Sequence, residues 1–122
     1  MWRPICTPEL CREMLFSPAL SDADLQKWHK CLQNESYWLG TQLLCGCGPK
    51  PAPPSGIPTL VVVGDRDQAV RVKDVEQVAA YHGTQAVIMP GLPHDLMLDE
   101  GAAKVAERVV HWLKNDGPNR TD

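Results

Sequence analysis

The pattern of apolar and polar positions divides the chain into a helical front and an α/β back. In the front, apolar residues recur at three- and four-residue steps after Ser21, a residue type that favours a helix N-cap. This pattern predicts a helix from about residue 22 to 34 that covers one face. An irregular segment with one helical turn near residues 9 to 16 precedes it, and a second apolar patch at residues 37 to 44 follows it.

The back of the chain alternates strand and helix patterns. Residues 60 to 63 form a short apolar run without polar alternation, which is typical of a strand buried on both faces. A helical pattern through residues 71 to 82 ends at Gly83, and residues 85 to 89 read as a second strand. The order strand, helix, strand predicts a βαβ unit with parallel strands. An amphipathic helix from about residue 100 to 114 completes a βαβα arrangement of the α/β class.

A proline-rich stretch separates the two parts, since PKPAPPSGIP contains five prolines in ten residues. Such composition is typical of a semi-rigid linker. We therefore expect four regions along the chain. These are a helical segment at residues 1–47, a linker at 48–57, the βαβα portion at 58–114 and a tail at 115–122.

Composition excludes several classes of protein. With 122 residues, of which 43% are apolar, the chain has room for one modest core. The net charge of −3 and the lack of a Lys or Arg cluster argue against nucleic-acid binding. No apolar run approaches the roughly 18 residues of a membrane span, and the N-terminus lacks the apolar region of a secretory signal. Five cysteines, an odd number, favour reduced thiols, so we expect a soluble intracellular protein.

Polar residues that could carry chemistry follow each predicted strand. Asp65 and Asp67 come directly after the first strand, and His94 follows the second. Because the carboxyl ends of parallel strands meet at one edge of a sheet, an aspartate and the imidazole are expected to lie close together. A carboxylate that accepts the Nδ1 proton of a histidine orients it as a general base, as in a nucleophile, base and acid triad. The alternative is that the aspartates cap the following helix and that His94 is a surface residue.

The residues of the back carry a resemblance to a known family. Gly64-x-x-Asp67 after a β-branched strand, the stretch PGLPHDLMLD at residues 90–99 and a helix ending in His-Trp-Leu resemble the C-terminal third of an α/β-hydrolase. The serine hydrolases of the monoacylglycerol lipase and lysophospholipase kind are the most similar. The resemblance covers residues 57 to 114, and residues 14 to 44 more loosely resemble the cap of such enzymes.

The resemblance implies a partial α/β-hydrolase fold, with a helical cap segment before the βαβα unit. It implies Asp67 as the triad acid and His94 as the general base, and an ester such as a lipid monoester as the small-molecule substrate. We assign no cofactor and no metal to the site.

The sequence departs from the family at the nucleophile. An α/β-hydrolase carries its serine on a G-x-S-x-G elbow before the acid and the histidine, and these 122 residues contain no such elbow. Cys47 stands between two glycines, but the motif needs one more residue on each side. A zinc site at Cys45-x-Cys47 would lack a second pair of ligands.

Two hypotheses follow. The first is the cap and C-terminal part of an ester hydrolase, present as a fragment, a truncated product or half of a split enzyme, and inactive without a complementing N-terminal hydrolase half. The second is a non-catalytic module that binds a partner through a strand edge left bare.

Overall fold

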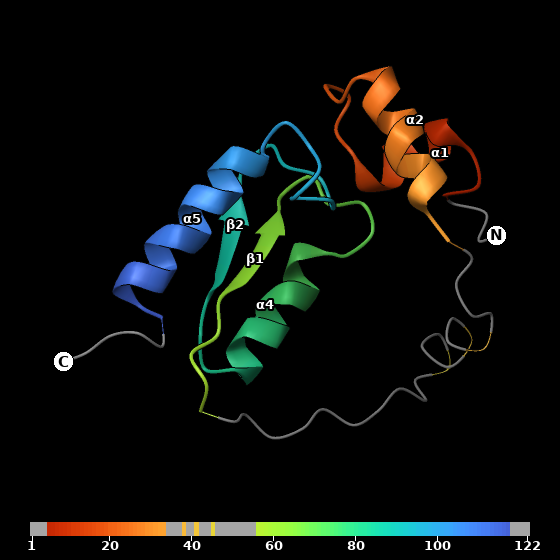
Figure 1. The fold of residues 1–122 in the computed structure, drawn as a ribbon. Helices are drawn as coiled ribbons and strands as arrows, with labels where there is room; N and C mark the ends of the chain where they lie inside the picture. The colour runs from red at the N-terminus through yellow and green to blue at the C-terminus, as the bar shows by residue number, and fades with distance from the viewer. Residues whose placement is uncertain (1–4, 34–37, 39–40, 42–44, 46–55, 118–122) are drawn as a thin grey trace.

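The computed structural model describes residues 5–33, 38, 41, 45 and 56–117. Within these ranges the elements follow in the order α1 (Pro8–Leu15), α2 (Asp22–Cys31), β1 (Val61–Gly64), α4 (Val72–Tyr81), β2 (Ala86–Met89) and α5 (Ala102–Asn115) (Figure 1). Helices combined with a parallel sheet make the fold broadly α/β. Most of the predicted linker and of the apolar patch at residues 37 to 44 lies outside the described residues.

The two strands pair in parallel, with Val61 opposite Ala86 and Gly64 opposite Met89. This confirms the predicted pairing, although each strand begins one residue later than the apolar run suggested. Helix α4 forms the crossover and packs against both strands, and α5 lies on the other side of the sheet (Figure 1). Gly83 follows α4 with φ of 70°, a conformation that glycine adopts without a steric penalty.

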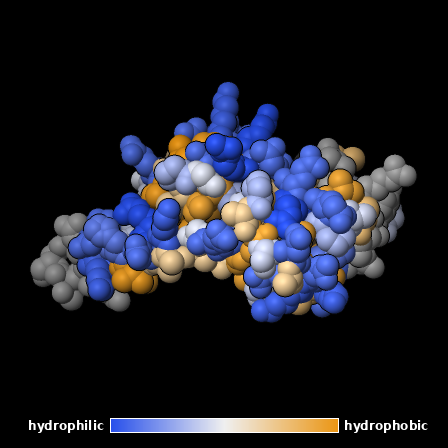
Figure 2. Space-filling model, turned by 90° about the horizontal axis from the view of Figure 1, so that it is seen from above, coloured by the Kyte–Doolittle hydropathy of each residue, from blue (hydrophilic) through white to orange (hydrophobic). Residues whose placement is uncertain are grey.

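The strands are less buried than the apolar pattern predicted. Val63 and Gly64 are buried, but Val61 and Val62 are half-buried and Ile88 is 44% exposed. Of residues 60 to 63, whose pattern suggested burial on both faces, only Val63 is buried. The reason is that β1 and β2 have no further neighbouring strand in the part of the chain that the structure describes. Figure 2 shows apolar residues at the surface between hydrophilic ones.

Helices α1 and α2 form a hairpin that lies beyond the carboxyl ends of the strands (Figure 1). Its core contains Cys11, Phe16, Leu20 and Leu25. Ser21 caps α2 as predicted, since its hydroxyl oxygen accepts a hydrogen bond from the Asp24 N–H. Helix α2 ends at Cys31, earlier than predicted, because the backbone of the next residue is extended.

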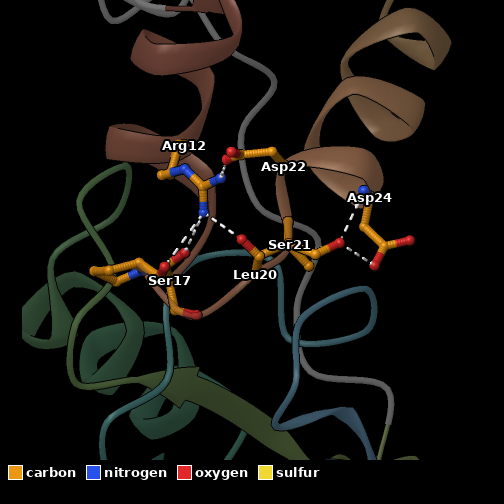
Figure 3. A network of polar contacts seen from close by, with 7 residues as sticks. Arg12, Ser17, Leu20, Ser21, Asp22 and Asp24 are labelled. Carbon is orange, nitrogen blue, oxygen red and sulfur yellow. Dashed lines mark hydrogen bonds and ion pairs between the residues drawn. The ribbon is translucent and has the colours of Figure 1, made fainter.

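Arg12 organises the turn of the hairpin (Figure 3). Its guanidinium donates to the carbonyl oxygens of Ser17 and Leu20, at 3.2 and 2.6 Å, and pairs with the Asp22 carboxylate at 2.6 Å. A planar group with five donors suits this arrangement of several acceptors. Across the described residues, no helix combines the length and apolar character needed to cross a membrane.

Candidate functional site

Asp67 lies in the turn that follows β1, and its carboxylate is oriented by the backbone. The Oδ1 atom accepts hydrogen bonds from the N–H groups of Ala69 and Val70, each at 2.8 Å. Only 6% of the side chain is exposed. These bonds occupy one carboxylate oxygen and leave Oδ2 for a donor from another segment.

His94 supplies that donor. Its Nδ1 atom lies 2.9 Å from Asp67 Oδ2, so the expected contact between the two side chains is present. An ionised carboxylate accepts and does not donate, which means that Nδ1 carries the proton. The His94 side chain is 39% exposed, and among the described residues its Nε2 atom makes no hydrogen bond. The ring is therefore oriented through Nδ1, while Nε2 has no hydrogen-bond partner among the described residues.

Asp65 has a different partner. Its Oδ1 accepts a hydrogen bond of 2.6 Å from the N–H of Gly91, in the loop that carries His94. The backbone N–H of Asp65 donates to Met89 and that of Arg66 donates to Leu92, so the turn after β1 is tied to the loop after β2. Asp65 thus joins the two loops, and Asp67 alone of the two aspartates contacts His94.

The capping alternative does not describe α4. The N-cap of this helix is Arg71, whose side chain does not cap a backbone N–H group of the first turn. Arg71 instead pairs with the half-buried Asp74 through two hydrogen bonds of 2.8 and 2.9 Å. The hydrogen bond to Asp74 raises the pKa of Arg71, and the same contact lowers the pKa of Asp74. This ion pair lies outside the site.

Gly64 allows the close approach of the His94 loop. A Cβ atom at this position would lie 2.1 Å from the carbonyl oxygen of Leu92 and 2.5 Å from that of Pro93. Leu92 in turn is buried and packs on Gly101, where a Cβ would meet the leucine side chain at 2.2 Å. Two glycines therefore set the path of the loop, and through it the position of His94.

The structure also identifies polar residues near the site that the sequence did not single out. Asp99 is the one charged residue that is buried in the described ranges, and it contacts Ser17 of the helical hairpin. The backbone N–H of Asp95 donates to the carbonyl of Leu15 at 2.8 Å. No periodicity or motif could predict a contact between Ser17 and Asp99, which lie about 80 residues apart. The signal that could have identified Asp99 is an aspartate within an apolar stretch, LMLDE, because such a residue is expected to be buried and hydrogen-bonded.

Two surface hollows of the described residues lie outside this site. One of about 450 Å³ runs along α5 from Ala106 to Asn115, and one of about 310 Å³ lies near Thr59, His82 and Trp112. No group of three or more metal-binding side chains occurs among the described residues. Cys47, considered above as a nucleophile and a zinc ligand, lies outside them.

Comparisons with protein-family models, curated proteins and solved structures found no match. The geometry of Asp67 and His94 is therefore the basis on which a role can be assigned to this edge of the sheet.

Proposed function

We propose that Asp67 and His94 are the acid and the general base of an ester hydrolase, of which this chain forms the C-terminal part with its helical cap. The observation that carries the proposal is the 2.9 Å contact from His94 Nδ1 to the Asp67 carboxylate, whose side chain is 6% exposed, while Nε2 makes no hydrogen bond to a described residue. This is the arrangement that a triad requires of its base.

In the proposed reaction, Nε2 of His94 accepts the proton of an attacking hydroxyl group. The imidazolium that forms is stabilised by Asp67, which remains ionised. His94 then returns the proton to the oxygen of the leaving alcohol, and in the second half-reaction it activates water to release the acid. A lipid monoester is the substrate class implied by the family resemblance.

We expect the nucleophile to come from elsewhere, because these 122 residues contain no G-x-S-x-G elbow. Ser17 donates its hydroxyl hydrogen bond to Asp99, and Ser21 caps α2, so both hydroxyls have structural roles. We propose that the serine elbow, the oxyanion hole and further strands are supplied by a polypeptide segment outside these 122 residues. The strand edge of β1 that is unpaired in the described structure is where a further strand would add.

Complementation tests this function. The chain is mixed with the N-terminal half of an α/β-hydrolase, cut before its acid-bearing strand, and hydrolysis of p-nitrophenyl butyrate is measured. We expect turnover from the mixture and none from either part alone. Asp67→Asn should lower kcat by about four orders of magnitude, and His94→Ala should lower it at least as far. His82→Ala, which changes an exposed histidine at the end of α4, is the matched control and should leave kcat unchanged.

Turnover by the chain alone that is abolished by His94→Ala would show that it contains its own nucleophile, and Cys47 would be the first residue to replace. Stable association of the two halves without any ester hydrolysis would favour the second function, a module that binds a partner through the edge of β1. The unpaired edge is the observation that supports this second function.

A further inference from the structure

Asp99 is buried without a cationic partner in the described part of the chain. Its side chain instead receives three hydrogen bonds. Oδ2 accepts from the N–H of Ser17 at 2.8 Å, and Oδ1 accepts from the Ser17 hydroxyl at 2.7 Å and from the N–H of Glu100 at 2.8 Å. Two of the three donors therefore belong to one residue of the helical hairpin. A buried carboxylate that loses such donors is strongly destabilised.

Ser17 is also held in place by contacts within the hairpin. It lies in the turn between α1 and α2, where its carbonyl accepts from Arg12, as does that of Leu20 (Figure 3). The hairpin therefore offers both Ser17 donors in a defined orientation. Asp99 docks on a preformed turn.

The same loop that ends at Asp99 carries His94. At its start, the Gly91 N–H donates to Asp65. Directly after His94, the Asp95 N–H donates to Leu15, the last residue of α1. The loop is thus held by the sheet before the imidazole and by the hairpin after it.

We infer that Asp99 is a positioning residue for His94, which it acts on by fastening the loop to Ser17. The hairpin then does more than cover the site, because its docking sets how well the imidazole contacts Asp67. When the hairpin moves away from the loop, the contacts of Ser17 with Asp99 and of Leu15 with Asp95 are lost. The His94 ring is then no longer held in position. This inference rests on the proposed function, in which His94 is the base.

The test measures the imidazole of His94 directly, by NMR of the full chain with labelled histidine side chains. Ser17→Ala removes the hydroxyl donor and keeps the backbone N–H, and Asp99→Asn removes the carboxylate. Both should accelerate exchange of the His94 Nδ1 proton by roughly three- to tenfold, the factor expected when loss of one hydrogen bond favours an opened loop. Ser21→Ala is the matched control, because it breaks the other serine and aspartate contact of the hairpin and should leave this exchange unchanged.

A folded Ser17→Ala chain whose His94 Nδ1 proton exchanges at the original rate would overturn the inference and leave the proposed function standing. If both variants unfold while Ser21→Ala folds, Asp99 is a determinant of the fold and the inference is likewise overturned. An unprotected Nδ1 proton in the unchanged chain would contradict the Asp67 and His94 pair itself, and the proposed function with it.

Discussion

Gly64 is the residue at which the strand and the His94 loop come closest. In Gly64→Ala the new methyl group would overlap the backbone of Leu92 and Pro93, which cannot rotate away as a flexible side chain could. We expect a loss of about 1–3 kcal/mol or more in the free energy of unfolding, the range of overpacked sites. Urea denaturation measures it.

Gly83→Ala is the control, since Gly83 has a positive φ but open space around the site of a Cβ. In Gly83→Ala, backbone strain from the positive φ alone should lower the free energy of unfolding by about 1–2 kcal/mol. A Gly64→Ala chain with an unchanged free energy of unfolding would mean that the His94 loop does not lie on Gly64.

Cys11 is the most buried thiol described, with 0% of the residue exposed. Burial, and secondarily the charge of Asp95, raise the pKa of this thiol, so it remains protonated at neutral pH. We expect Cys11 to react with a thiol reagent much more slowly than the exposed Cys31, and to become reactive on unfolding. Mass spectrometry of timed labelling at neutral pH checks this.

The raised pKa also predicts a pH dependence. A thiol whose pKa is higher in the folded chain than in the unfolded chain contributes its full stability below the unfolded pKa. That contribution is lost as the pH rises through the folded pKa, because the unfolded chain then gains from ionisation. Cys11→Ala should remove this alkaline component of the unfolding curve. An unchanged alkaline component would assign it to other groups.

At the scale of elements, the hairpin depends on one guanidinium. Arg12→Lys keeps the charge but replaces a planar group with five donors by a point charge, so the contacts to Ser17, Leu20 and Asp22 cannot all be made. Hydrogen bonds from charged groups contribute about 1.5–3 kcal/mol each. We expect a lower thermal midpoint by circular dichroism. Arg108→Lys on α5, whose arginine makes no hydrogen bond to a described residue, should have little effect.

The elements that the sequence predicted are those with local signals. The apolar runs, the helical period of residues 72 to 81 and the Ser21 cap all act within a few residues, and they led to the correct order and to parallel pairing. Of the two aspartates, Asp67, which the family resemblance implied as the partner of His94, is the one in contact with it. The catalytic roles of the pair remain a prediction.

Several contacts between distant segments could not be predicted from local sequence patterns. The burial of the first strand is lower than its pattern suggested. A β-branched run indicates that the residues suit a buried environment, but not whether other elements are present to bury them. The Ser17 and Asp99 contact joins residues 82 positions apart, and the role of Arg12 depends on how a turn folds back on a helix. Such contacts follow from tertiary packing, which no periodicity encodes.

At the scale of the whole molecule, few of the described apolar residues are buried and many large ones are exposed, with Val78 at 52% and Met97 at 77%. A few hundred Å² of uncovered apolar surface corresponds to several kcal/mol at roughly 25 cal/mol per Å². A domain's whole stability is about 5–15 kcal/mol. We expect the isolated chain to bind a dye such as ANS and to aggregate on concentrating. A monomer with a sharp melt and no dye binding would favour the self-sufficient module.

The contact between Ser17 and Asp99 also has a consequence for the order of folding. It closes a loop of 82 residues, whereas Asp67 and His94 are separated by 27. Loop-closure entropy makes the longer closure more costly by about 1 kcal/mol. The βαβ unit can therefore assemble with its acid and imidazole before the hairpin docks. We expect docking to be the last step in folding and the first to reverse.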